Sequence, residues 1–164
     1  LSEAKALPET PPLCIYLTIS TGIGIGVVRD GRLDPDFLHS EAGHMTLEFD
    51  GSIREWEDFA SGRSIKSTYG KYARNIHNKH IWQQIADKIS RGILALIPIM
   101  NPDTIIIGGS IGTYFKQYDE ALRQYVASRL DKRFFSMPDI RQATHPEEAV
   151  VYGCYYYAIE QLSD

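Results

Sequence analysis

Residues 14–33, CIYLTISTGIGIGVVRDGRL, alternate between segments that favour strands and segments that favour turns. Residues 14–19 are rich in β-branched and aromatic side chains, as expected for a buried strand. A glycine-spaced loop follows at residues 20–26, and strand character resumes after it. Asp30-Gly31 is a strong hairpin signal, because glycine readily adopts the positive φ angle of a type I′ turn. This order predicts an antiparallel meander of three strands.

The rest of the chain predicts alternating helices and strands. Apolar residues recur at spacings of three and four from residue 81 to residue 100, which indicates one long helix. Residues 104–107 form an apolar run followed by two glycines, typical of a strand buried on both faces. The other predicted elements are short helices at 56–60 and 64–73, a helix at 114–130, a strand at 139–144 and a helix from Pro146 to about residue 162. The order βββαβαβα resembles that of a ribonuclease-H-like α/β lobe, with a mixed sheet flanked by helices, as in actin, sugar kinases and Hsp70-type ATPases.

The composition excludes several classes of protein. The chain has 164 residues, about the length of one domain, and 43% of them are hydrophobic. Its net charge of −4 lacks the basic surplus of a nucleic-acid-binding protein. The longest apolar run, residues 92–100, is too short to span a bilayer, so no membrane partner is expected. The two cysteines, Cys14 and Cys154, are too few and too far apart for a disulfide scaffold, and we expect buried, reduced thiols in a cytoplasmic protein.

Two glycine-containing segments suit a nucleotide. In residues 21–26 (TGIGIG), backbone N–H groups can approach an anion closely, and Thr21 adds a hydroxyl. The alternative is a glycine-rich hairpin or bulge without a ligand. In residues 105–110 (IIIGGS), a buried strand meets a glycine pair and then a helix, a place where nucleotides bind. The alternative there is a tight turn between strand and helix.

A third segment suits a polyol. In residues 41–44 (EAGH), a carboxylate and an imidazole three positions apart can converge on one small ligand. A sugar is a plausible ligand because its hydroxyls both donate and accept hydrogen bonds. The alternative is a solvated turn in which His44 bonds to a backbone group.

Together these segments resemble the ROK family of sugar kinases and sugar-responsive repressors. Residues 19–27 are similar to the family's phosphate loop, and residues 41–44 to its Glu-x-Gly-His sugar motif. Residues 57–62 (EDFASG) are similar to its Glu-x-x-Ala-Ser-Gly segment, and residues 101–109 to its Asn-Pro…Gly-Gly strand. The resemblance extends from residue 14 to about residue 158, with the motifs in the family's order.

The resemblance implies a set of site residues. Hexose hydroxyls would be bound by Glu41, His44 and Glu57. ATP would be bound by Thr21, Gly22 and Gly24 at its phosphates and by Gly108, Gly109 and Ser110 at its adenosine. The family transfers the γ-phosphoryl group of ATP, with Mg²⁺, to a sugar hydroxyl, usually at carbon 6, by positioning and charge stabilisation.

The chain departs from the family pattern in three ways. The family's catalytic Asp lies in an Asn-Asp-Ala motif upstream of the phosphate loop, and residues 1–164 contain no such motif. We therefore expect residues 1–12 to be a residual helix and linker from a missing N-terminal lobe and residues 13–164 to be the C-terminal lobe, inactive by itself and without a catalytic residue. Many members bind zinc through the motif histidine and three cysteines, but residues 45–56 contain no cysteine, so we expect no zinc. Ser20 and Ile25 stand where the family usually has glycine.

The leading hypothesis is the C-terminal lobe of an ATP-dependent hexose kinase. One alternative is the sugar-sensing lobe of a ROK-type repressor, and another is a degenerate homologue that binds no ligand. The expected partners are a hexose and ATP, with a possible homodimer and no nucleic acid bound by this chain.

Overall fold

The computed structural model describes residues 1–163. Asp164, the last residue of the predicted lobe, lies outside the described residues. The helices and strands are α1 (Ser2–Lys5), β1 (Leu13–Ile19), β2 (Ile23–Arg29), β3 (Arg32–Leu33), β4 (Thr46–Phe49), β5 (Ser52–Glu55), α2 (Trp56–Ala60), α3 (Gly62–Tyr69), α4 (Lys79–Met100), β6 (Thr104–Gly108), α5 (Gly109–Gly112), α6 (Asp119–Arg129), β7 (Asp139–Gln142) and α7 (Ala149–Ser163). Short 3₁₀ turns lie at Pro35–Phe37, Ala42–His44, Ala73–Asn75 and Phe115–Gln117.

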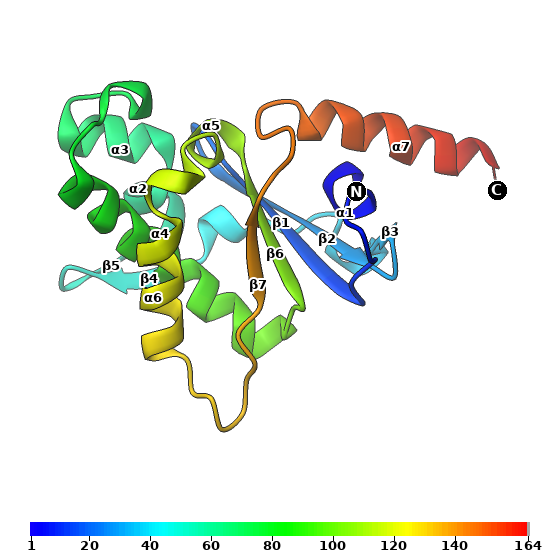
Figure 1. Ribbon diagram of the computed structural model, residues 1–164, viewed down its shortest axis with the longest axis horizontal. Coiled ribbons are helices and arrows are strands. Elements are labelled where there is room, and N and C mark those ends of the chain that lie inside the picture. Colours follow the sequence, from blue (N-terminus) through cyan, green and yellow to red (C-terminus); the bar gives the residue numbers. More distant parts are fainter. Residues whose placement is uncertain (164) are drawn as a thin grey trace.

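A five-stranded mixed sheet forms the centre of the molecule (Figure 1), in the order β3-β2-β1-β6-β7. β1 pairs antiparallel with β2, which in turn pairs antiparallel with β3, as the meander predicts. On its other side β1 pairs parallel with β6, and β6 pairs parallel with β7. The mixed sheet predicted from the sequence is therefore confirmed.

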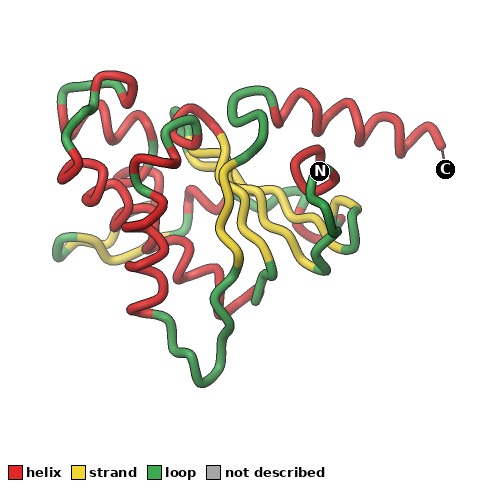
Figure 2. Tube along the Cα trace, viewed as in Figure 1, coloured by secondary structure: helices red, strands yellow, loops and turns green. Residues whose placement is uncertain are grey.

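Helices cover both faces of this sheet (Figure 2). Alternate residues of β1, such as Ile15 and Leu17, belong to the main hydrophobic core, which also includes apolar residues of α4 and α6. The intervening residues face the other way, and Cys14 packs in a smaller cluster that includes Ala4 of α1. Figure 1 shows α1 and α7 on one side of the sheet and α2 to α6 on the other. This two-sided burial explains why β6 is an unbroken apolar run.

The hairpin of β4 and β5 was not predicted from the sequence, although its signal is present. Asp50 and Gly51 form its turn, and both have positive φ angles, 52° and 74°. They repeat the Asp-Gly signal of residues 30–31. In the hairpin register Thr46 lies opposite Glu55, and the next residue, Trp56, continues the ladder by donating its amide to the Met45 carbonyl at 2.8 Å.

Three local predictions are corrected by the structure. The helix predicted to start at residue 114 starts at Asp119, because Tyr118 is buried in the core and the segment before it forms a 3₁₀ turn. The last helix begins at Ala149 rather than Pro146, after a turn in which the Ala149 amide donates to the His145 carbonyl. Cys154 is exposed rather than buried, because α7 extends outward past the sheet (Figure 1).

A buried carboxylate connects the two ends of the chain. Glu3 of α1 accepts hydrogen bonds from the backbone amides of Thr144, at 2.6 Å, and His145, at 2.9 Å. These bonds position the loop between β7 and α7. Within residues 1–163, none of the helices combines the length and the apolar character that a membrane span requires.

Candidate functional site

The proposed sugar residues lie where the glycine loop, the 3₁₀ turn at Ala42–His44 and α2 meet. A Cβ atom on Gly43 would lie 2.4 Å from the Ile23 carbonyl oxygen and 2.9 Å from Glu57 Oε2. A Cβ atom on Gly22 would lie 2.6 Å from the same Glu57 oxygen. Gly43 therefore has no room for a side chain, because it faces the backbone of Ile23, whereas a side chain at Gly22 would displace the Glu57 carboxylate.

A buried tryptophan positions the carboxylates on either side of it. Trp56 is fully buried, and its indole N–H donates to the Lys88 carbonyl at 3.2 Å. Glu55 and Glu57 flank this anchor in the chain and are only partly buried. The buried ring thus holds the first turn of α2 against α4, and with it the two acidic side chains.

Both oxygens of Glu57 have partners. Its Oε2 accepts a hydrogen bond from the Ile23 backbone amide at 3.2 Å, which ties α2 to the glycine loop. Its Oε1 accepts from the Arg63 guanidinium at 3.0 Å, and the Glu57 side chain is only 15% exposed. These partners hold the carboxylate in one orientation, and each oxygen retains capacity to accept a ligand hydroxyl.

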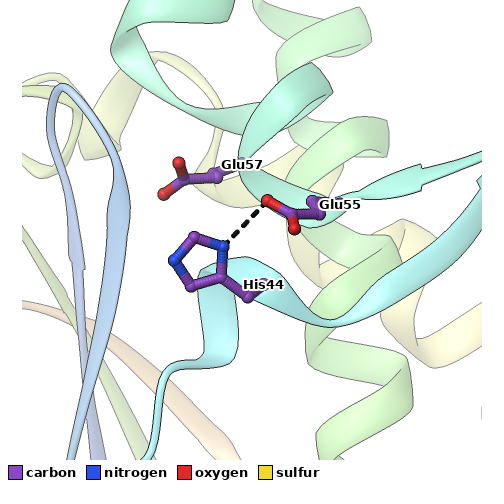
Figure 3. A group of neighbouring side chains, drawn as sticks. All are labelled: His44, Glu55 and Glu57. Atoms are coloured by element: carbon purple, nitrogen blue, oxygen red, sulfur yellow. Dashed lines mark hydrogen bonds and ion pairs between the residues drawn. The ribbon is translucent and has the colours of Figure 1, made fainter.

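His44 lies beside these groups and has a carboxylate partner of its own. Its Nδ1 and Glu55 Oε2 are 2.8 Å apart (Figure 3). The hydrogen bond with Glu55 raises the pKa of His44 above 6.5, and the negative charges of Glu55, Glu57 and Glu41 act in the same direction. One ligand atom from each of His44, Glu55 and Glu57 lies within 4.8 Å of the others.

Glu41 is exposed and immediately precedes this 3₁₀ turn. Its side chain makes no capping hydrogen bond to the turn. Its charge nevertheless contributes to the raised pKa of His44, so it lies within electrostatic range of the imidazole. The structure thus brings His44 and Glu57 into one cluster and places Glu41 at its exposed edge.

A cavity of about 510 Å³ lies on the other side of Arg63, the ion-pair partner of Glu57, and is not lined by Glu41, His44 or Glu57 themselves. Its polar lining consists of hydroxyl groups from Ser20, Thr21 and Ser110, the cationic side chains of Arg63, Lys66 and Arg74, and the carboxylate of Glu147. Its aromatic lining is provided by Tyr72 and Tyr114. Hydroxyls and cations suit a polyanion, and aromatic rings suit a flat base.

The rim of this cavity is joined by hydrogen bonds between distant segments. The Ser110 amide donates to Ser20 Oγ at 3.0 Å, and the Gly62 amide donates to the Ser20 carbonyl at 2.6 Å. Ser20 therefore connects the glycine loop to both α5 and α3. Its hydroxyl has a structural partner at a position where the family usually has glycine.

The remaining predicted nucleotide residues do not line this cavity. Gly24 lies within β2 and lines a different cavity, of about 440 Å³, on the side of the sheet covered by α1 and α7. Gly108 ends β6 against the Tyr16 hydroxyl, which leaves no space for a side chain. Gly109 has a φ of 78°, and its amide donates to the Pro146 carbonyl at 2.6 Å. Thr21 and Ser110 are the two predicted nucleotide residues in the lining.

The cations of the cavity were missed in the sequence, although a signal exists. Arg63 directly follows the Ala-Ser-Gly segment, and Lys66 comes three residues later, on the same face of a helix. The Lys66 ammonium donates to the Tyr72 hydroxyl at 2.6 Å and lowers the pKa of Tyr72. Glu55 was also missed. The hairpin signal at residues 50–51 places it opposite Thr46 and so beside His44.

Comparison with known proteins identifies the family. A sequence model of the ROK family matches residues 1–161. The chain belongs to the ROK family. This confirms the resemblance based on the motifs.

The curated relatives include both kinases and repressors. A fructokinase of Pediococcus pentosaceus is 30% identical over 119 residues, which cover 66% of this chain and 40% of the fructokinase. A xylose repressor of Caldicellulosiruptor bescii is 25% identical over 184 residues, which cover 90% of this chain and 46% of the repressor. This ROK chain thus spans about half the length of the curated relatives it matches.

Solved structures of ROK proteins share the fold. A ROK family protein from Streptococcus pneumoniae in complex with sucrose gives a TM-score of 0.79 at 23% identity, covering 99% of this chain and 63% of that chain. A ROK hexokinase from Thermus thermophilus gives a TM-score of 0.70 at 25% identity, covering 94% of this chain and 60% of that chain. The predicted α/β lobe of the actin and sugar-kinase type is therefore confirmed.

Proposed function

We propose that this chain is the C-terminal lobe of a hexose kinase, which binds the sugar and ATP while the γ-phosphoryl group passes to a sugar hydroxyl, usually at carbon 6. One observation supports this most strongly. The Arg63 guanidinium lines the 510 Å³ cavity and pairs with Glu57 at 3.0 Å. One side chain therefore joins the proposed sugar cluster to the proposed nucleotide cavity, and phosphoryl transfer requires the two ligands to be adjacent.

The cavity fits ATP by the chemistry of its lining. Arg63, Lys66 and Arg74 would face the phosphates, together with the hydroxyls of Thr21 and Ser110. The rings of Tyr72 and Tyr114 offer apolar surfaces to the base. Mg²⁺ would be held chiefly by the phosphates, with Glu147 as the nearby carboxylate. ATP supplies the transferred phosphoryl group when bound.

The sugar would be held by groups of complementary character. The Glu57 and Glu41 carboxylates accept hydrogen bonds from hydroxyls, and the His44 imidazole can accept or donate. We assign no general base within this chain, because the family's Asn-Asp-Ala motif does not occur in residues 1–164. The two free thiols suit a reducing compartment, so the proposal includes a cytoplasmic location. It is also compatible with a homodimer.

The test is hexose phosphorylation by the intact protein, measured as ADP release. Glu57→Gln should lower kcat/KM about 10- to 100-fold, because a hydrogen bond to a charged group contributes about 1.5–3 kcal/mol. Asp58→Asn is the matched control, since Asp58 is exposed and is the next residue of α2. The control should retain wild-type activity. An unchanged kcat/KM of Glu57→Gln with every hexose that the wild type phosphorylates would contradict the assignment.

A second candidate is the sugar-sensing lobe of a repressor. It is favoured by the match to a xylose repressor, which covers 90% of this chain. Isothermal titration calorimetry of the intact protein separates the candidates. A kinase binds both ATP and sugar and releases ADP, whereas a repressor lobe binds sugar without turnover. Absence of heat with either ligand would indicate a degenerate homologue.

A further inference from the structure

We propose that Glu55 is a positioning residue for His44: in the neutral ring it holds the imidazole proton on Nδ1 and leaves Nε2 as an acceptor facing the sugar. Many ROK members bind zinc through the histidine of this motif. In this ROK protein the Glu55 carboxylate would orient the His44 ring in place of that zinc ion. The inference rests on the proposed sugar site at His44.

The backbone of Glu55 is held in place by the β4–β5 hairpin. Glu55 is the last residue of β5, opposite Thr46 in the register, and Thr46 is two positions from His44. The next amide, that of Trp56, is bonded to the Met45 carbonyl at 2.8 Å. Two strands and a buried ring therefore fix the backbone on both sides of the 2.8 Å contact between Glu55 Oε2 and His44 Nδ1.

The carboxylate of Glu57, which also lies near His44, has other partners. The oxygens of Glu57 accept from the Ile23 amide and the Arg63 guanidinium. Glu55 is therefore the carboxylate that bonds the ring. Figure 3 shows the second ring nitrogen of His44 pointing away from Glu55, on the side where the Glu57 carboxylate lies. That side belongs to the cluster in which we place the sugar.

When the His44 ring is neutral, the contact with Glu55 determines which ring nitrogen carries the proton. One nitrogen of a neutral imidazole carries the proton and the other accepts. A carboxylate on Nδ1 requires the proton there, so Nε2 becomes an acceptor for a sugar O–H. A metal ion on Nδ1 would use that lone pair and leave the proton on Nε2, which would then donate. Glu55 thus reverses the direction of the hydrogen bond that His44 offers to a sugar.

The side chains present do not fit a structural zinc site. Zinc in such sites has four ligands, mostly thiolates and imidazoles. In the described part of the chain the cluster offers one imidazole and two carboxylates, and both oxygens of Glu57 are already bonded. Cys14 is buried in β1 and Cys154 lies on α7, so neither joins the cluster. A zinc ion on Nδ1 would have to displace Glu55.

The primary experiment reads the tautomer directly, independently of any activity. Two-bond ¹H–¹⁵N NMR spectra of the intact protein are recorded at a pH at which the ring is neutral, and the His44 signals are assigned with His44→Asn. We expect a protonated Nδ1 and an unprotonated Nε2. Glu55→Ala should redistribute the proton toward Nε2, Glu55→Gln should retain part of the preference, and Glu48→Gln, in the same hairpin, should change nothing.

Enzyme kinetics give a second readout. At the pH of the NMR measurement, at which the ring of His44 is neutral, Glu55→Ala should raise the sugar KM about 3- to 10-fold, the effect of one hydrogen bond, with kcat changed less than twofold. Glu55→Gln should recover part of the loss, and Glu48→Gln should match the wild type. One equivalent of Zn²⁺ should leave the His44 resonances unmoved.

The results distinguish the role of Glu55 from the proposed function of the protein. A proton on Nε2 in the wild type, a tautomer unchanged in Glu55→Ala, or a stoichiometric shift of Nδ1 by Zn²⁺ would each overturn the role of Glu55. A protein with the expected tautomer that binds no hexose would instead refute the proposed function.

Discussion

Gly92→Ala is expected to destabilise the protein, although alanine is the better helix former. Gly92 lies in α4 against the indole of Trp56. A Cβ atom at this position would lie 2.1 Å from Trp56 Cε2 and 2.4 Å from Cζ2. These are ring atoms of a fully buried side chain whose N–H is bonded to the Lys88 carbonyl. The ring cannot move aside without breaking that bond.

Two opposing effects determine how much Gly92→Ala changes the free energy of unfolding. Replacing glycine by alanine within a helix gains about 1 kcal/mol in intrinsic propensity. Overpacking a core costs about 1–3 kcal/mol, and three ring atoms within 2.4 Å place this case at the upper end. The net expectation is a loss of about 2 kcal/mol in the free energy of unfolding. Any movement of Trp56 would also displace Glu55 and Glu57.

The assay is urea unfolding followed by circular dichroism, with the same substitution at Gly153 as the control. A Cβ atom on Gly153, in α7, meets no atom within 4 Å. Gly153→Ala should therefore lose no stability and gain up to about 1 kcal/mol. A Gly92→Ala variant as stable as the wild type or more so would refute overpacking against Trp56, because helix propensity alone would then account for both positions.

Three further predictions concern individual side chains. Glu3→Gln leaves one oxygen acceptor for the two backbone amides that Glu3 binds. In urea titrations it should lower the unfolding free energy by about 1–3 kcal/mol, the cost of a buried group without a partner. Wild-type stability would contradict the role of Glu3 in holding the loop between β7 and α7. Because Glu55 raises the pKa of His44, protonated His44 stabilises the fold fully below pH 6.5, and this contribution is lost as the pH rises through the raised pKa. An NMR titration should show that pKa falling in Glu55→Gln, and an unchanged value would exclude the ion pair. Finally, Cys154 is exposed, whereas burial raises the pKa of Cys14 to about 11, so a maleimide should label Cys154 in the native protein and both thiols after unfolding; native labelling of Cys14 would argue against the packing of β1.

The sheet could be predicted because its signals are local. The β-branched and aromatic side chains of residues 14–19, the turn at Asp30-Gly31 and the unbroken apolar run of β6 each report burial or backbone conformation within a few residues. The same kind of signal at Asp50-Gly51 would have predicted the second hairpin. Helix boundaries were less accurate, because burial of Tyr118, a tertiary effect, sets the start of α6.

The site was predictable only in part. The motifs contain His44 and Glu57, but no local pattern states which oxygen accepts from which donor. The pairing of Arg63 with Glu57 and the contact between Glu55 and His44 follow from how α2, α3 and the hairpin pack against the glycine loop. Gly24 lies on the other side of the sheet because of its register in β2, opposite Thr18. A one-dimensional pattern encodes which residues are buried and where the chain turns. Which side chains then meet depends on the packing of whole helices and strands. Contacts between segments distant in sequence form only when the apolar faces of these elements pack against one another.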